Sequence, residues 1–198
     1  MINLLFKNTK VLLLSLTVLL FSANSLAASQ TYPLDPGLSQ VSFATIKKQY
    51  VVEPAKIAKL SGELKDTGQV SIQVPLQEIS TGISIRDDRL NTIFFESIKF
   101  PTVNISADVK DSLKAAKAAE RKTMTFNVEI YGETKPILAE VIISQSKSHI
   151  VVSSLAPLII KAKDFSIPAA NLIKLANTVG DIAISSTVPV NFTVVFAK

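Results

Sequence analysis

The sequence predicts an all-β protein, an eight-stranded antiparallel barrel with one to three short helices. Three observations support this prediction. Apolar and polar residues alternate in several long segments, turn-forming residues lie between these segments, and the number of strand-like segments is about eight. Eight antiparallel strands can close a barrel whose interior holds side chains or one ligand. Closure also removes the exposed strand edges that invite aggregation.

The alternation is clearest in residues 70–76, 103–109, 124–130 and 188–196, where every second residue is apolar. This period of two is typical of an antiparallel strand with one buried face and one solvated face. Weaker examples are found at residues 41–43 and 60–64.

Turn signals and longer apolar stretches complete the expected sheet. Asp66-Thr67-Gly68 and Tyr131-Gly132-Glu133-Thr134 are typical of hairpin turns. Residues 138–143 and 149–160 are more continuously apolar. We therefore expect these two stretches to be buried on both sides or to be covered by a helix.

Three stretches depart from the period of two and are the predicted helices. Residues 86–96 carry apolar side chains at helical spacing, with acidic residues near the start. Residues 111–122 are rich in Ala and Lys and indicate a short polar helix or a mobile insertion. Residues 168–176 begin with proline, which is favoured in the first turn of a helix.

The N-terminus has the features of a secretory signal peptide. Lys7 and Lys10 precede an apolar run at residues 11–21, and Ser25-Leu26-Ala27 supplies small residues at a cleavage site. The run is much shorter than the roughly 20 residues that span a bilayer. We therefore expect residues 1–27 to be a cleaved signal peptide, residues 28–198 to form a single barrel domain, and the mature protein to be periplasmic.

Composition excludes several classes of function. Loss of Lys7 and Lys10 would lower the formal net charge from +5 to +3, and the basic residues are scattered, so nucleic acid is not expected as a partner. The chain has no cysteine and one histidine, which excludes disulfides, thiol catalysis and a multi-histidine metal site. We expect no metal and no cofactor.

No arrangement of residues predicts catalysis. A serine triad would have to use His149, which lies at the start of a predicted strand beside a turn. Asp87 and Asp88 are adjacent, so on a helix their side chains diverge and cannot straddle one bond. We therefore predict that the protein is not an enzyme.

The stretch from Ser80 to Pro101 resembles the signature of the YceI-like family. In that family a Thr, often followed by Gly, closes a strand, and an Arg-Asp pair, a Leu, a Phe-Phe-Asp/Glu and a Tyr/Phe-Pro follow. The corresponding residues here are Thr81-Gly82, Arg86-Asp87, Leu90, Phe94-Phe95-Glu96 and Phe100-Pro101.

Further pieces resemble the family in the same order along residues 31–197. They are Tyr32 to Asp35 with Ser39, Leu60-Ser61-Gly62, Ile130 to Pro136, and the closing strand at 183–196. The chain departs from the family at three places: Arg89 replaces a usual His, Lys47-Lys48 stands where the first strand often ends in His, and Phe165-Ser166 replaces a usual Phe-Gly.

The resemblance implies a lipocalin-like barrel, exported to the periplasm, that binds a long-chain isoprenoid or similar lipid in its lumen. Predicted inward positions of the four clear strands are apolar and carry no charge, which agrees with this role. The candidate lumen residues are Phe43, Ile72, Val74, Phe94, Phe95, Ile105, Phe126, Val128, Val190 and Phe192.

Arg86 and Arg89 are candidates for contact with an anionic head group, because guanidinium donates in a fork that suits phosphate. Alternatively, Arg86 pairs with Asp87, Asp88 or Glu96 and anchors the helix. The competing function is an envelope structural or protein-interaction barrel without a lumen ligand, since any barrel core needs alternating apolar residues. A homodimer is a possible assembly.

Overall fold

The computed structural model describes residues 29–115 and 119–198. The predicted signal peptide lies outside these residues. The strands are β1 (Thr31–Pro33), β2 (Gln40–Lys47), β3 (Val51–Ile57), β4 (Ser61–Lys65), β5 (Gln69–Pro75), β6 (Ile79–Ser80), β7 (Thr102–Asp108), β8 (Ala119–Ile130), β9 (Glu133–Gln145), β10 (His149–Ser154), β11 (Leu158–Lys161) and β12 (Thr187–Ala197). The helical elements are η1 (Leu76–Glu78), α1 (Ser84–Arg89), the π-helical η2 (Leu90–Phe94), α2 (Lys110–Ala115), η3 (Ala162–Phe165) and α3 (Ala169–Asn177).

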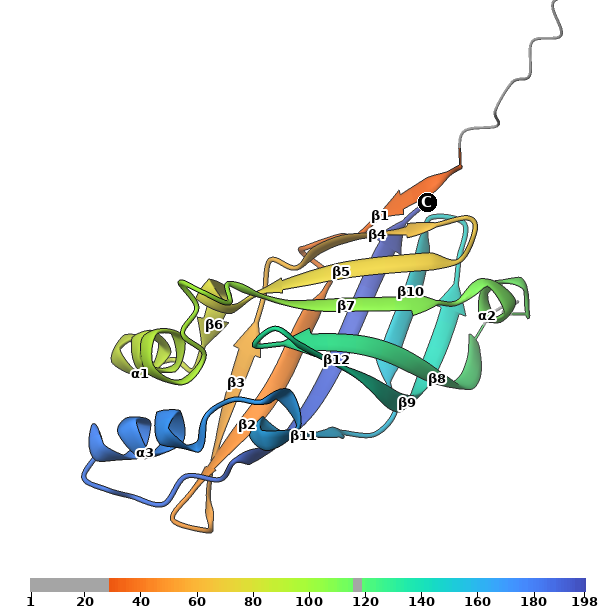
Figure 1. The fold of residues 1–198 in the computed structure, drawn as a ribbon. Coiled ribbons are helices and arrows are strands. Elements are labelled where there is room, and N and C mark those ends of the chain that lie inside the picture. Colours follow the sequence, from red (N-terminus) through yellow and green to blue (C-terminus); the bar gives the residue numbers. More distant parts are fainter. Residues whose placement is uncertain (1–28, 116–118) are drawn as a thin grey trace, which may run out of the picture.

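The strands form one strongly curled antiparallel sheet, a half-barrel, in the order β1-β4-β5-β7-β8-β9-β10-β12-β2-β3-β6, with β11 on β12 (Figure 1). Leu34, next to β1, makes an antiparallel bridge to Phe196 in β12, so the two distant parts of the sheet meet. The predicted all-β barrel class is confirmed. The described residues contain more strands than the eight expected, because several are short segments such as β6 and β11.

Both predicted hairpins are present. β4 and β5 flank residues 66–68, and β8 and β9 are joined by Tyr131 and Gly132. These two residues have φ angles of 56° and 79°, so both lie in the left-handed region that a two-residue hairpin turn requires. The tight turn fixes the register of β8 against β9 over their full length.

Two strand predictions need correction. In β9 the apolar residues alternate: Ala139, Val141 and Ile143 are buried, while Leu138 is 68% exposed and Ile142 37%. The stretch is therefore buried on one face only. Apolar side chains on its exposed face are not unusual, because much of a protein surface is apolar. Residues 149–160 are not buried on both sides either, because Leu155 and Ile159 are 46% and 59% exposed and the chain bends between β10 and β11 at residues 155–157.

The helix predictions are confirmed at residues 84–94 and 169–177, where Pro168 is the residue before the first turn of α3. The prediction for residues 111–122 is only partly right. Helix α2 covers Lys110–Ala115, but Ala119 to Lys122 belong to β8 and pair with β9. The long β8–β9 ladder therefore overrides the helical preference of this Ala- and Lys-rich stretch.

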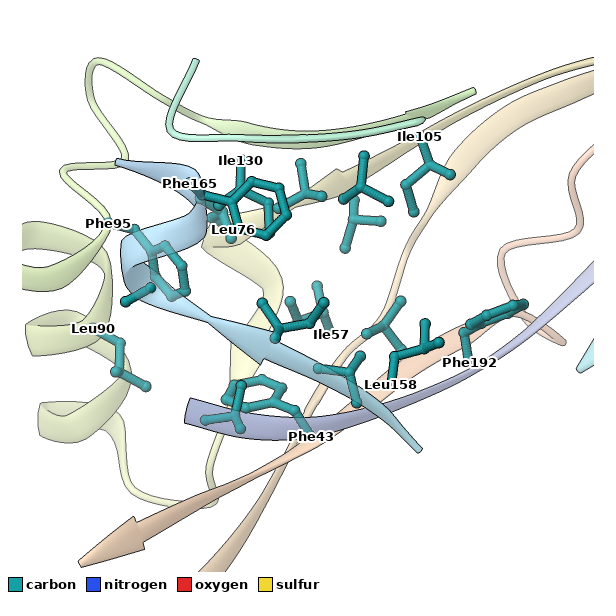
Figure 2. Close-up of a pocket in the computed structure, with 18 of the residues that line it drawn as sticks. Phe43, Ile57, Leu76, Leu90, Phe95, Ile105, Ile130, Leu158, Phe165 and Phe192 are labelled. Atoms are coloured by element: carbon teal, nitrogen blue, oxygen red, sulfur yellow. The ribbon is translucent and has the colours of Figure 1, made fainter. Parts of the chain in front are cut away.

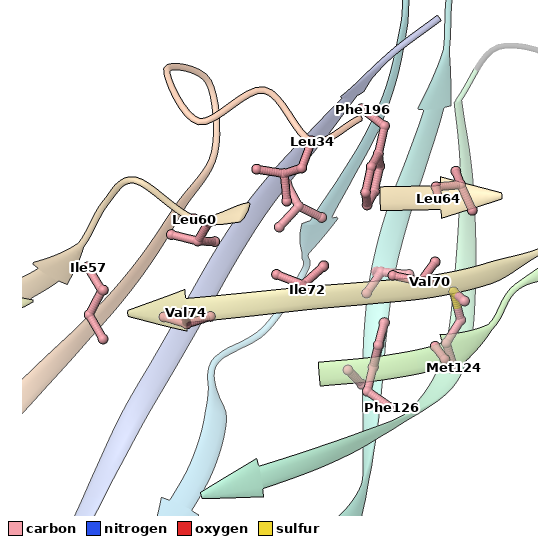
Figure 3. Packing of buried hydrophobic residues seen from close by; sticks show 14 of the residues in the cluster. Leu34, Ile57, Leu60, Leu64, Val70, Ile72, Val74, Met124, Phe126 and Phe196 are labelled. Atoms are coloured by element: carbon pink, nitrogen blue, oxygen red, sulfur yellow. The ribbon is translucent and has the colours of Figure 1, made fainter. Parts of the chain in front are cut away.

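The buried core lies inside the curled sheet (Figure 3). Leu60, Leu64, Val141 and Phe196 are at most 1% exposed. Val195 breaks the alternation of β12 because the segment before β2 covers its outer side: the Asp35 N–H donates to its carbonyl at 2.8 Å, and its own N–H donates to Ser39 Oγ at 3.0 Å.

Candidate functional site

A cavity of about 370 Å³ runs through the interior of the curled sheet. Among the 44 described residues that line it, all are apolar except Thr45, Lys47, Arg86, Arg89, Ser185 and Ser186. Figure 2 shows labelled side chains from opposite walls, such as Phe43 and Ile105, directed into the same space. The volume falls within the range of roughly 300–1,000 Å³ that small-molecule sites occupy.

All ten residues named from the sequence as lumen candidates line this cavity. The register explains why strands distant in sequence contribute to one wall. Ile72 pairs with Ile105, and Ile105 pairs with Val128, so β5, β7 and β8 place one row of side chains on the inner face. Val190 pairs with Phe43 in the same way and joins β12 to β2.

Four aromatic rings make two edge-to-face pairs in the cavity wall. The ring centroids of Phe94 and Phe95 are 4.8 Å apart, and those of Phe126 and Phe192 are 5.7 Å apart. Such pairs add some stability beyond their buried area. Phe94 is the last residue of η2 and Phe95 follows it directly. Both therefore line the cavity from a helical segment and not from a strand.

Sequence reasoning missed part of the wall. Leu158, Phe165, Leu172 and Leu175 line the cavity from β11, η3 and α3. The helical spacing within residues 168–176 predicted an apolar face for α3, but nothing local indicated that this face covers the lumen.

The six polar residues define what we call the mouth of the cavity. Thr45 and Lys47 lie on β2, Arg86 and Arg89 on α1, and Ser185 and Ser186 before β12. The elements are joined: Lys47 bridges to Ile184, and the Ser185 N–H donates to the Ile46 carbonyl at 2.8 Å. Ile83, Ile85 and Val179 also line the cavity and are 47%, 53% and 37% exposed, so the cavity reaches solvent here.

Glu53 on β3 connects the basic residues of the mouth. Its carboxylate accepts a two-pronged contact from Arg86, with Nη1–Oε2 at 2.9 Å and Nη2–Oε1 at 3.0 Å. Lys47 Nζ lies 2.5 Å from the same Oε2. The expected pairing of Arg86 with Asp87, Asp88 or Glu96 is therefore wrong, because the guanidinium reaches across to the sheet instead.

The other residues of the signature have different partners. Asp87 Oδ1 accepts from the Thr81 N–H at 2.8 Å and from Thr81 Oγ1 at 2.6 Å, which fixes the entry to α1. Arg89 is half-buried, and within residues 29–115 and 119–198 its side chain has neither an ion-pair partner nor a hydrogen-bond partner. Of the two arginines, Arg89 is therefore the one left free to meet a ligand.

Glu96 holds the helical elements over the cavity. Its carboxylate contacts Lys99 Nζ at 2.8 Å and accepts from the Tyr131 hydroxyl and from Asn171 Nδ2, the latter at 3.1 Å. Asn171 also donates to the Phe94 carbonyl at 3.1 Å. One carboxylate thus connects η2, the β8–β9 turn and α3. Hydrogen bonds from Lys99, Tyr131 and Asn171 lower the pKa of Glu96 from 4.5 to about 2.

We expect Glu96→Gln to weaken the dependence of stability on pH in acid. A carboxyl whose pKa is lower in the folded state adds stability that is complete above its ordinary pKa of 4.5 and is lost as the pH falls toward about 2. Urea unfolding at a series of pH values should therefore show a shallower acid decline for the variant. Glu63→Gln, at a half-buried position on β4, is the control for the loss of a carboxylate elsewhere in the sheet. Equal slopes for Glu96→Gln and the unchanged chain would contradict this role.

Among the described residues, no three His, Cys, Asp or Glu side chains are grouped so that they could hold a metal ion. His149 Nδ1 lies 2.8 Å from Ser148 Oγ, and His149 does not line the cavity. In the same part of the chain, no helix has the length and apolar character needed to cross a membrane.

The fold and the site together define a lipocalin-like barrel with an apolar lumen and one polar mouth. Comparison with family models matches residues 32–196 to the YceI-like domain. The chain therefore belongs to the YceI-like family, and the resemblance seen in the sequence is confirmed.

Two solved structures show the same fold. A polyisoprenoid binding domain from Saccharophagus degradans, implicated in plant cell wall breakdown, is 26% identical with a TM-score of 0.79, over 84% of this chain and 97% of that one. BcnA from Burkholderia cenocepacia is 16% identical with a TM-score of 0.61, over 82% and 98% of the two chains. A search of curated protein sequences found no match.

Proposed function

We propose that this protein binds a long apolar amphiphile, a polyisoprenoid or similar lipid, in its lumen and carries it without chemical change in the periplasm. The observation that carries this proposal is the cavity itself. Its lining is apolar except at the six polar residues of the mouth, and it reaches solvent where Ile83, Ile85 and Val179 are exposed. The polyisoprenoid-binding relative from Saccharophagus degradans supports the class of ligand, and the predicted signal peptide supports the location.

The energetics favour a long hydrocarbon chain. Each buried methylene contributes about 0.8 kcal/mol, so one isoprene unit gives roughly 3–4 kcal/mol before costs. Several units would together exceed the roughly 18–21 kcal/mol at which non-covalent affinity saturates. The entropy lost when the tail is ordered must offset much of this gain. The length of tail that fits the cavity should therefore determine preference.

The mouth supports an anionic head group. A tail inside the apolar lumen leaves its polar end beside Lys47, Arg86 and Arg89, which line the cavity, whereas no carboxylate is among the described residues that line it. Arg86 is already bound to Glu53 through both terminal nitrogens, so it would have to exchange partners. Arg89 is free to donate to a phosphate or carboxylate. We propose Arg89 as the main head-group contact and Arg86 as a secondary one.

The alternative function, a structural or interaction barrel without a ligand, requires a lumen filled by side chains. The cavity favours the binding role instead. An enzyme acting on lipid would need a nucleophile and a base within reach of each other. At the mouth the Ser185 hydroxyl donates to the Thr187 carbonyl and Lys47 Nζ is paired with Glu53, so these two groups have other partners.

Extraction of natively purified protein with organic solvent, followed by mass spectrometry, tests the proposal. We expect release of an apolar compound in roughly stoichiometric amount, with an acidic head group visible in negative-ion mode. Protein denatured and refolded before extraction is the control and should release none. Repeatedly empty extracts, together with failure to take up a polyprenol offered in detergent, would contradict the proposed function.

A further inference from the structure

The end of the barrel that carries the mouth also carries a concentration of exposed apolar side chains. Several of the large hydrophobic residues that are exposed among the described residues lie there, and we call six of them the rim: Tyr50, Val51, Val52, Ile83, Ile85 and Val179. Figure 1 shows the β2–β3 hairpin, α1 and α3 at this end, and α2 at the other. Ion pairing of Arg86 with Glu53 ties α1 to β3, so these segments belong to one surface.

The rim is continuous with the lumen. Ile83, Ile85 and Val179 are exposed and line the cavity at the same time. A hydrocarbon chain that entered the lumen past these residues would keep contact with apolar surface along its path. An apolar entrance of this kind is unfavourable in water, but it becomes favourable against the edge of a bilayer.

The hairpin between β2 and β3 has the composition of an interfacial segment. Lys47 and Lys48 are followed at once by Tyr50, Val51 and Val52, which are 84%, 45% and 60% exposed. Lysine next to an aromatic and aliphatic cluster suits the boundary of a bilayer, because the apolar groups enter the acyl region while the ammonium groups stay at the phosphates.

The backbone of the turn holds this tip in a tight shape. Lys48 and Gln49 both have positive φ angles, 49° and 68°, and the Tyr50 N–H donates to the Lys47 carbonyl at 3.1 Å. Two successive residues in the left-handed region are what a tight hairpin turn requires, as at Tyr131 and Gly132. The turn leaves Tyr50 84% exposed between β2 and β3.

Charge at this surface complements an anionic bilayer. Residues 47–53 and α1 together carry Lys47, Lys48, Arg86 and Arg89 against Glu53, Asp87 and Asp88. Glu53 is shared by two cations, and Asp87 accepts hydrogen bonds from Thr81. The balance is positive, and basic groups near anionic phospholipid each add to attraction.

We infer that the rim docks on the surface of a phospholipid bilayer that contains anionic lipid, and that the mouth then faces the acyl chains from which the ligand is drawn. This inference rests on the proposed function, because it names the surface that supplies the lumen. The apolar rim provides most of the attraction, and the basic residues add a contribution that salt weakens.

Co-flotation of the purified full chain with vesicles of phosphatidylcholine and phosphatidylglycerol tests the inference. The double variant Tyr50→Ser/Val52→Ser should partition about tenfold more weakly than the unchanged chain, because two exposed apolar groups no longer enter the bilayer. The matched control is Leu138→Ser/Ile142→Ser, which removes two exposed apolar residues from the outer face of β9. It should partition like the unchanged chain. All three proteins share the same N-terminus, so their differences report the substitutions.

Several outcomes overturn the inference. They are absence of flotation by the unchanged chain, equal flotation by the rim variant, and equal loss in the β9 control. A further outcome is self-association of the unchanged chain without vesicles. If the rim variant abolishes that self-association, the rim binds a second copy of this chain rather than a bilayer. Uptake of a polyprenol from detergent micelles is measured in parallel: uptake without flotation refutes the docking surface alone, whereas absent uptake refutes the proposed function.

Discussion

Replacement of Val128 with tryptophan is expected to abolish uptake of a long apolar ligand while the protein stays folded. Val128 is half-buried, lines the cavity, and sits between Ile105 and Lys135 in the β7–β8–β9 part of the sheet. Because the indole would occupy space that the ligand needs, affinity should fall at least about tenfold. The stability of the protein should change little, since the larger side chain enters an open volume and buries its own apolar surface.

The chain contains no tryptophan, so the introduced indole can be followed alone. Its fluorescence should be blue-shifted in Val128→Trp and red-shifted in the control Asn127→Trp, whose side chain is exposed on the opposite face of β8. Thermal unfolding and ligand uptake are measured for both variants. If Val128→Trp instead loses about 1–3 kcal/mol of stability, the lumen is already full and overpacking is the cause. That result would remove the basis of the binding role.

The lumen positions were predictable because two local rules agree. A period of two assigns a face, and antiparallel pairing then brings the same faces together, as Ile72, Ile105 and Val128 show. The helical stretch that contains Phe94 and Phe95 was also visible as a break in that period. The family signature added the order of the elements, which composition alone does not contain.

Long-range contacts were not predictable in the same way. Arg86 binds Glu53, 33 residues earlier in the chain, and no local pattern distinguishes that partner from the nearer Asp87 or Asp88. The contacts of Glu96 were unpredictable for the same reason, because Tyr131 and Asn171 reach its carboxylate from other elements. Pairing partners of charged groups depend on which surfaces meet, and this is decided by the whole fold.

Two local features of the sequence are explained by the structure. Pro157 lies in the bend that divides residues 149–160 into β10 and β11, and proline cannot donate within a ladder. Ser166 stands where the family usually has glycine, and its φ of 56° shows why glycine is favoured there.

The largest loss of stability is expected from Phe196→Ala. Phe196 is 1% exposed, pairs with Ile150 in β10, and bridges to Leu34, so it packs where the two distant parts of the sheet meet. Truncation of a buried phenylalanine costs about 3–5 kcal/mol, from lost transfer energy and the space left behind. This is a large share of the roughly 5–15 kcal/mol that holds a typical domain folded.

Phe192→Ala is the matched comparison, because Phe192 lies on the same face of β12, four residues earlier, but is only half-buried. Its ring contacts Phe126 on one side and borders the open cavity on the other. Both rings line the cavity, but Phe196 is 1% exposed, whereas Phe192 is only half-buried. Removal of Phe192 should therefore cost less than half as much, since a less buried ring has fewer contacts to lose. Urea unfolding with an unchanged m-value measures both costs. Equal losses at the two positions would mean that the wall at Phe192 is packed as densely as the junction at Phe196, and a densely packed wall leaves no room for a lipid tail.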